Sequence, residues 1–286
     1  MLRRLDGPNG RGWPFVALLK KQTNEANRMS ESMRTVIVTG GSGGIGRATA
    51  ERLARDFCMV VPVARSIDGV ASTAARIREA GAAALPIDQD MREAVAAERV
   101  VEAVLAATGR IDAVVNVAGA VSQTDLFQMT DEEWADGLSL KFHGARKLTL
   151  AAWPALKASR GSVIFMSGTA AVTPKASLCA VSSINAAIVA LAKAFSERGV
   201  CDGVQVNSVL PGPVMTERRR KMLSHYATTK GLDLDAASKA FQQETGITRY
   251  GEPADVAELI AFLVSPQSRW LTGVAVRIDG GEIKAA

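Results

Sequence analysis

The sequence predicts an α/β protein built on a doubly wound parallel sheet, with helices on both faces. Short β-branched runs alternate with alanine-rich stretches of helical length from residue 34 onward, and this alternation indicates βαβ units. The runs are apolar at consecutive positions, which is typical of strands that are covered on two faces. Glycines are concentrated directly after the first run, where a tight strand-to-helix turn needs them.

The predicted elements follow one another without a repeat or a linker, so we expect residues 34–286 to form a single domain. The six predicted strands are Thr35–Thr39, Met59–Ala64, Ala113–Asn116, Ser162–Met166, Val204–Val209 and Val274–Ile278. The helical segments include Ile45–Asp56, Asp131–Ala158, Ser182–Arg198 and Ala254–Val264. Pro253 begins the last of these at a first-turn position, where its missing N–H costs nothing.

Residues 1–33 have a different composition, rich in Gly, Asn, Arg and Pro, with one short apolar stretch from Phe15 to Leu19. That stretch is too short for a secretory signal. We expect these residues to form a disordered extension, of the kind that arises when an upstream start is chosen over Met29 or Met33. A tail that binds a lipid or a partner is the alternative.

Composition excludes several classes of protein. Apolar residues make up 48% and charged residues 22% of the 286 residues, as in globular domains. The net charge is +5, more than half of it in residues 1–33, so the body has no basic face for nucleic acid. Three scattered cysteines and two histidines indicate neither a disulfide framework nor a metal centre. The apolar runs are shorter than the ~20 residues that span a bilayer. We therefore expect a soluble, cytoplasmic protein that binds no metal, nucleic acid or membrane.

The first predicted strand leads into a glycine-rich loop, and a helix follows at once. The loop reads Thr39-Gly40-Gly41-Ser42-Gly43-Gly44-Ile45-Gly46 and fits both GxGxxG and TGxxxGxG. Glycines at this place let the backbone turn tightly and approach a pyrophosphate, which then lies on the free N–H groups of the helix N-terminus. The loop therefore predicts a dinucleotide site on a Rossmann-type sheet, with a purely structural turn as the alternative.

The end of the second predicted strand distinguishes the two nicotinamide dinucleotides. An acidic residue there accepts hydrogen bonds from the 2′-hydroxyl of the adenosine ribose and repels a 2′-phosphate. This sequence has Ala64 followed by Arg65 and no carboxylate, and a guanidinium forms bidentate pairs with phosphate. We expect NADP(H) rather than NAD(H). An ordinary solvated arginine is the alternative for Arg65.

Over residues 34–283 the chain resembles the short-chain dehydrogenase/reductase family, on five motifs in the right order. These are TGGSGGIG at 39–46, Asp88 where the family has an acidic residue after its third strand, NVAG at 116–119, PGPVMT at 211–216 and DGG at 279–281. The resemblance implies oxidoreductase activity and a homodimer or homotetramer built on the helices near 131–158 and 182–198. It also implies a set of cofactor-binding residues: Gly40, Ser42, Gly44, Ile45, Gly46, Arg65, Asp88, Asn116, Ala118, Gly119, Asn185, Pro211, Gly212, Val214 and Thr216.

The resemblance breaks at the catalytic positions. The family uses an Asn, a Ser and a Tyr–Lys pair spaced YxxxK, in which the phenol protonates the substrate oxygen and the neighbouring ammonium makes it a competent acid. By register, the Tyr and Lys positions hold Val181 and Asn185. The Ser position holds Gly168, with Ser167 just before it, and the Asn position holds Lys141. The sequence thus predicts atypical acid machinery.

Lys141 and Ser167 are the candidate catalytic residues. The ammonium of Lys141 can replace the charge lost at Asn185, polarise an oxygen of the substrate, or donate a proton once desolvated. A tie to neighbouring backbone is the alternative for Lys141. Ser167 is one step from the expected register, and its side chain reaches the site only if the loop is shifted by one residue. Asn185 keeps the capacity to hydrogen-bond the nicotinamide ribose.

Residues 215–250 are expected to form a mobile lid over the substrate. The chain has two tyrosines, Tyr226 and Tyr250, and both lie there. Tyr226 is the candidate for swinging toward the site, with packing in the lid as the alternative. The basic run at 217–221 predicts either a solvated helix face or a gate for an anionic substrate, such as a carboxylate or an acyl carrier.

Two functions remain open at this point. One is an NADP(H)-dependent oxidoreductase that reduces a carbonyl or imine-like group of a small molecule. The other is an NADP(H)-binding sensor or scaffold without redox turnover, and non-redox catalysis is a more distant third.

Overall fold

Eight parallel strands form one sheet in residues 34–284, the part of the chain that the computed structural model describes. The strands are β1 (Thr35–Thr39), β2 (Met59–Ala64), β3 (Ala83–Ala84), β4 (Ile87–Asp88), β5 (Ala113–Asn116), β6 (Ser162–Met166), β7 (Gln205–Pro211) and β8 (Ala275–Ile278). Their order is β3-β2-β1-β5-β6-β7-β8, and β4 also pairs with β2. Every pairing is parallel. The predicted sheet is confirmed, and the predicted extension at 1–33 lies outside the described residues.

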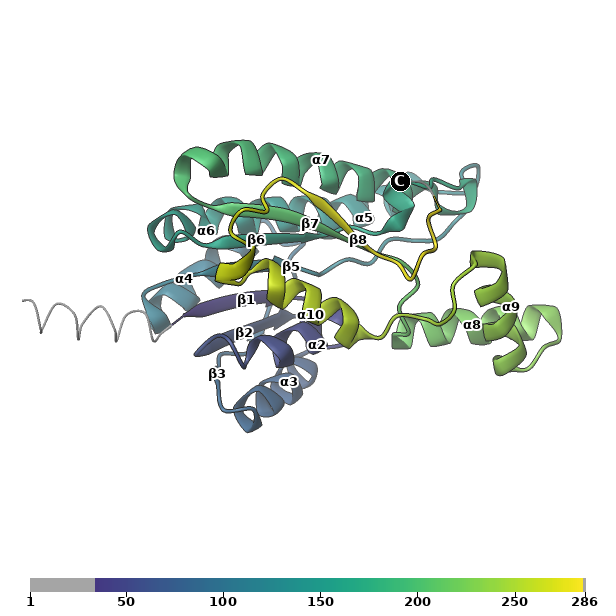
Figure 1. The fold of residues 1–286 in the computed structure, drawn as a ribbon, viewed down its shortest axis with the longest axis horizontal. Coiled ribbons are helices and arrows are strands. Elements are labelled where there is room, and N and C mark those ends of the chain that lie inside the picture. Colours follow the sequence, from purple (N-terminus) through teal and green to yellow (C-terminus); the bar gives the residue numbers. More distant parts are fainter. Residues whose placement is uncertain (1–33, 285–286) are drawn as a thin grey trace, which may run out of the picture.

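Helices cover both faces of this sheet (Figure 1). They are α2 (Gly44–Leu53), α3 (Ile67–Glu79), α4 (Ala96–Thr108), α5 (Asp131–Gly137), α6 (Ala145–Ser159), α7 (Cys179–Asp202), α8 (Glu217–Lys230), α9 (Leu234–Thr245) and α10 (Pro253–Leu263). Alternate residues of β1 supply the two cores: Ile37 packs in the layer of α4, α6 and α7, whereas Val36 and Val38 pack in the layer of α2 and α10. This alternation explains why the strands are apolar at consecutive positions.

The differences from the sequence-based elements are local. Strands β3 and β4 have two residues each, which is too short for a hydrophobic period. The predicted helix at 131–158 is divided, because a π-helical segment, Leu138–Gly144, separates α5 from α6. The stretch Ala176–Asp202 is apolar and long enough to cross a bilayer by length and composition alone, which corrects the expectation drawn from run lengths. Its helix α7 packs against β6 and β7, and 39% of the apolar window is buried in the protein.

The winding of the sheet reverses between β1 and β5, which are neighbours although three strands separate them in the chain. Ligands of doubly wound sheets bind at such a switch point, beyond the carboxyl ends of the strands. The loops after β1, β2, β5, β6 and β7 all leave the sheet at this edge. Helices α8 and α9 extend beyond it, at the right of Figure 1.

Candidate active site

The glycine-rich loop after β1 packs on its own backbone. A Cβ at Gly46 would lie 2.1 Å from the carbonyl oxygen of Gly40, so only glycine lets α2 come this close. Gly40 has φ +70°, a conformation that favours glycine. A Cβ at Gly43 would meet nothing within 4 Å, so this residue faces open space. Gly43 also precedes α2 without a side-chain cap, which leaves the first N–H groups of the helix available to an anion.

This loop contacts two other predicted cofactor segments. The Thr39 hydroxyl accepts hydrogen bonds from the backbone N–H groups of Val117 and Ala118, at 3.1 and 3.0 Å. These bonds join the ends of β1 and β5. On the other side, a Cβ at Gly44 would lie 3.4 Å from the Cγ2 of Thr216, which caps α8. Segments 39–46, 116–119 and 211–216 therefore come together around one site.

The remaining predicted cofactor residues lie at the same edge. Pro211 ends β7, and Gly212 permits a close backbone approach, because a Cβ there would lie 2.8 Å from the Cα of Asp279. Val214 forms an isolated bridge with Gly251. Three other predicted cofactor residues lie at the glycine-rich loop. Ser42 is in the loop before α2, and Ile45 and Gly46 are in the first turn of that helix.

Asn116 and Asp88 have different surroundings at this edge. Asn116 is buried at the end of β5, and its Nδ2 donates to the Thr149 hydroxyl at 3.1 Å. This bond ties β5 to α6. Asp88 is exposed at the end of β4, where a ligand that extends along the sheet edge can reach it.

Arg65 follows β2 and stands in solvent. Its side chain is 64% exposed, and its nearest acidic partner is the Asp90 carboxylate at 3.8 Å. Such a long, exposed ion pair contributes little, so the guanidinium is free to turn toward a phosphate. The next residue, Ser66, caps α3 through the N–H of Gly69 at 3.1 Å. Open helix N–H groups beside Gly43 and an exposed cation at Arg65 fit a dinucleotide that carries a 2′-phosphate.

Lys141 lies in the π-helical segment Leu138–Gly144, and π-helical turns are frequent at functional sites. Its side chain passes Gly119, where an added Cβ would come within 3.0 Å of the lysine Cδ. Its Nζ donates to the carbonyl oxygen of Ser167 at 3.4 Å and to Oδ1 of Asn185. The structure thus brings Lys141 and Asn185, which are 44 positions apart in the chain, into direct contact.

The surroundings of the Lys141 ammonium lower its pKa. Burial lowers the pKa of Lys141 to about 8, and the positive charge of Arg218 acts in the same direction. The ion pairs found within residues 34–284 do not involve Lys141. At neutral pH the group is protonated, but it releases its proton more readily than a solvated lysine.

Ser167 and Gly168 follow β6 directly and lie next to Asn185. The Ser167 side chain is 6% exposed, and its hydroxyl donates to the backbone carbonyl of Asn185 at 2.9 Å. This hydroxyl links the end of β6 to α7, and the catalytic role of Ser167 stays a prediction. Gly168 faces Asn185 instead, since a Cβ there would lie 3.0 Å from the Asn185 Nδ2.

No phenol stands at the position where the resemblance places one. Val181 is half-buried and packs against a small cluster that includes Val121 and Ile184. Tyr250 is buried against α9, where its ring stacks on Phe241 and its hydroxyl donates to the Ser238 carbonyl at 3.3 Å. Tyr250 is therefore a packing residue. The role predicted for Tyr226, which is half-buried on α8, stays a prediction.

The basic run at 217–221, at the start of α8, does not form one charged face. Arg218 reaches across to the loop after β5, where its Nη2 donates to the Val121 carbonyl at 2.6 Å. Arg219 points into the lid, with its guanidinium 5.1 Å from the centre of the Phe241 ring. Successive helical residues point about 100° apart, so a run of cations in the sequence could not reveal which one crosses to the loop.

No group of three or more His, Cys, Asp or Glu within residues 34–284 could hold a metal ion.

Comparison with known proteins shows which family this chain belongs to. A family model described as enoyl-(acyl carrier protein) reductase matches residues 40–282. Short-chain reductase protein NovJ of Streptomyces niveus is 31% identical over 259 residues, which covers 91% of this chain and 97% of NovJ. The chain belongs to the short-chain dehydrogenase/reductase family. A further relative is granaticin polyketide synthase putative ketoacyl reductase 2 of Streptomyces violaceoruber, at 33% identity over 86% of this chain and 94% of that protein.

Solved structures of the family have the same fold. L-sorbose reductase from Gluconobacter frateurii, complexed with NADPH and L-sorbose, superposes with a TM-score of 0.85 at 28% identity, covering 89% of this chain and 98% of that one. A variant of actinorhodin polyketide ketoreductase with NADPH gives a TM-score of 0.83 at 27% identity, covering 88% of this chain and 98% of that one. The Rossmann-type sheet predicted from the sequence is thus confirmed by family members of similar length.

Proposed function

We propose that this chain is an NADP(H)-dependent reductase of a carbonyl or imine-like group in a small molecule, with Lys141 as its proton donor. The observation that carries the proposal is the ammonium of Lys141 at Oδ1 of Asn185, beside the edge where the glycine-rich loop lies. Two family members with similar folds are described as complexes with NADPH, which supports the same cofactor here.

The residues present fit such a cofactor. The pyrophosphate would lie on the first N–H groups of α2, past Gly43, and Arg65 would pair with the 2′-phosphate. Thr216 and Gly44, which approach each other closely, would flank its path toward Asn185. The cofactor supplies a hydride to the carbonyl carbon of the substrate.

The family resemblance implies an asparagine at position 141 and a lysine at position 185. This chain has the reverse, Lys141 and Asn185. The ammonium reaches Asn185 from the π-helical segment rather than from α7, so a positive charge is kept at the site although α7 has no lysine there. Two N–H groups of Lys141 are directed to Asn185 and to the Ser167 carbonyl, which leaves the third for a substrate. That N–H donates its proton to the carbonyl oxygen as the hydride reaches carbon, and the neutral amine regains a proton from solvent.

A lysine replaces the usual phenol in this scheme, and the environment adjusts its acidity. A solvated ammonium has a pKa of about 10.4 and is a poor acid at neutral pH, whereas burial lowers the pKa of Lys141 to about 8. A catalytic group works best when its pKa lies near the operating pH. A proton donor of this kind serves carbonyls and neutral imines, whose oxygen or nitrogen takes up a proton as the hydride reaches carbon.

The alternative function is an NADP(H)-binding sensor or scaffold without turnover. It is favoured by Val181 and Gly168, which bring no hydroxyl to the site. It predicts tight NADPH binding together with no cofactor conversion.

One experiment separates the two functions. The purified protein is titrated with NADPH and NADH by fluorescence, and NADPH consumption is then followed with a panel of ketones, imines and, in the reverse direction, alcohols. Micromolar NADPH binding with turnover supports the reductase. Micromolar binding without turnover of any member of the panel rejects it in favour of the sensor.

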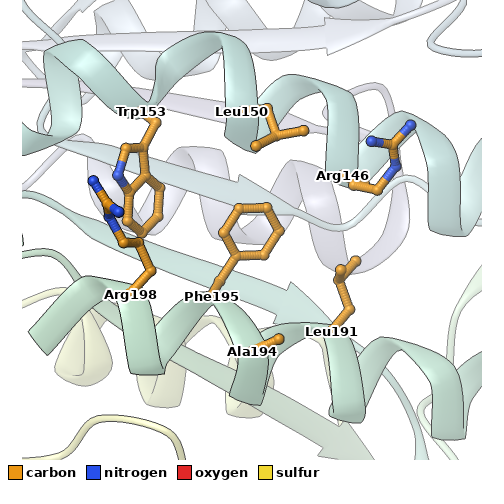
Figure 2. Close-up of a pocket in the computed structure, with 7 residues that line it drawn as sticks. All are labelled: Arg146, Leu150, Trp153, Leu191, Ala194, Phe195 and Arg198. Atoms are coloured by element: carbon orange, nitrogen blue, oxygen red, sulfur yellow. The ribbon is translucent and has the colours of Figure 1, made fainter.

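We further propose that the protein is a homodimer or homotetramer assembled through α6 and α7. Support comes from an apolar groove of about 520 Å³ between these helices, where Leu150 and Trp153 face Leu191 and Phe195 (Figure 2). A second copy of the chain would remove this groove from water. We also propose a cytoplasmic location, because Cys58, Cys179 and Cys201 are all free thiols, as is usual in reducing compartments.

A further inference from the structure

Two basic side chains contact the loop that follows β5. Arg218, in the first turn of α8, donates through Nη2 to the Val121 carbonyl at 2.6 Å. The side chain of Lys141 lies against Gly119, with its Cδ 3.0 Å from where a Cβ of that residue would be. Gly119 and Val121 are two residues apart, so the guanidinium of Arg218 from α8 and the aliphatic stem of Lys141 from the π-helical segment contact the same short stretch of chain.

Neither cation has an acidic partner in the described part of the chain. The ion pairs of residues 34–284 use other arginines, such as Arg92 with Asp136 and Arg249 with Asp255. Arg218 is exposed, and its one hydrogen bond engages one of the five N–H donors of a guanidinium. The Arg218 charge also acts on Lys141 directly, since it contributes to lowering the pKa of that lysine. The Glu133 carboxylate at this loop accepts hydrogen bonds from the hydroxyls of Ser122 and Thr124 and forms no ion pair with either cation. Two like charges that approach each other without an ion pair form a site that an anion stabilises.

We propose that Arg218 binds a carboxylate of the substrate while Lys141 contacts its carbonyl oxygen, so that the preferred substrates are small oxo acids. This inference rests on the proposed reductase function and specifies its substrate class. The guanidinium has a planar set of donors that matches a carboxylate. The Lys141 ammonium has one N–H left for the carbonyl oxygen. Because Arg218 belongs to α8, the carboxylate also ties the lid to the loop after β5.

The other basic residues of the run do not share this geometry. Arg219 is turned toward the Phe241 ring within the lid, and Arg220 is exposed one position further along α8. Arg220 is therefore a matched control: its replacement removes the same charge from the same turn without touching the loop after β5. A general electrostatic gate would respond equally to the loss of either charge.

The test compares acids with their uncharged esters. NADPH consumption is measured with 2-oxo and 3-oxo acids of four to six carbons and with the corresponding methyl esters, for the wild type and for Arg218→Met and Arg220→Met. We expect kcat/KM to favour the acid over its ester by about tenfold or more in the wild type, as a charge-assisted hydrogen bond predicts. The preference should fall to about one in Arg218→Met and persist in Arg220→Met. Equal use of acid and ester by the wild type, or an unchanged preference in Arg218→Met, overturns the inference.

A binding measurement keeps this test separate from the proposed function. Oxamate, a carboxylate that cannot accept a hydride here, and its methyl ester are titrated calorimetrically into the protein with bound NADP⁺. The inference expects oxamate to bind more tightly than the ester in the wild type and in Arg220→Met, and the two to bind alike in Arg218→Met. Oxamate binding that depends on Arg218 in a protein that reduces nothing would reject the reductase and leave the anion site intact. Oxamate binding that is absent or indifferent to Arg218, in a protein that turns over esters, would reject only the anion site.

Discussion

Methionine has a side chain of similar length to lysine and no charge. The substitution Lys141→Met therefore measures how much the buried ammonium lowers the free energy of unfolding. Burial lowers the pKa of Lys141 from 10.5 to about 8. At about 1.4 kcal/mol per pKa unit, this shift corresponds to roughly 3 kcal/mol of destabilisation at pH 7, where both states are protonated. Between pH 8 and 10.5 the unfolded chain holds the proton and the folded protein has released it. The stability of the wild type therefore rises with pH across this window.

The assay is urea denaturation of the wild type and of Lys141→Met at pH 7 and pH 9.5. We expect the free energy of unfolding of the wild type to rise by about 2 kcal/mol relative to that of the variant over this interval. At pH 7 itself the variant loses the donor to Oδ1 of Asn185, an effect of about 1–3 kcal/mol that opposes the gain. The change with pH is thus the decisive quantity. Lys147→Met, in the adjoining helix α6, is the matched control, and an identical pH response of Lys141→Met and the wild type would refute the reasoning.

Three further predictions address the rate, the cofactor and the assembly. Because the protonated amine of Lys141 is the donor, kcat/KM for reduction should fall as pH rises through about 8. Stopped-flow rates for Lys141→Met should show no such decrease with pH. The same decrease in both proteins would assign it to another group. Arg65→Asp should lower the ratio of NADPH to NADH affinity at least tenfold in fluorescence titrations, and an unaltered ratio would remove Arg65 from cofactor selection. Leu150, which is 49% exposed in the groove between α6 and α7, should tolerate Leu150→Glu without unfolding. This variant should be monomeric by light scattering, whereas an unchanged mass would place the interface elsewhere.

Most of the fold could be predicted from the sequence because its signals are local. Val36, Ile37 and Val38 are apolar in succession, and the structure shows why: neighbouring residues of β1 face different helix layers. The turn at Gly40 and Gly46 was likewise predicted from glycines, and it needs them for a positive φ and for close backbone approach. The two-residue strands β3 and β4 were not defined as strands, because pairing with β2 specifies them and a short apolar run does not.

The site was predictable residue by residue but not as an arrangement. Register placed Lys141 and Asn185 at two positions of the family pattern, yet only the fold shows that their side chains touch. The π-helical segment that aims Lys141 has no sequence signature of its own, since its residues continue an ordinary helical pattern. Ser167 was placed one residue from the family's Ser position by register, and its bond to the Asn185 carbonyl appears only in three dimensions.

The lid illustrates the same limit. The run of basic residues after Thr216 predicted a charged gate or a solvated face, and the structure divides the run among different surroundings. Arg218 crosses to the Val121 carbonyl and Arg219 contacts Phe241, because consecutive helical residues point in different directions. Charge composition alone therefore located the segment but not the residue.

The most direct test of the central claim compares Lys141→Met with the wild type in two measurements on the same samples, the NADPH dissociation constant and single-turnover reduction of the best substrate found. A lost general acid typically lowers the rate by 10²–10⁴-fold. If Lys141 is the proton donor, the variant should show a loss of about this size, with an NADPH dissociation constant within about twofold of the wild type. Equal single-turnover rates in the two proteins would contradict the claim.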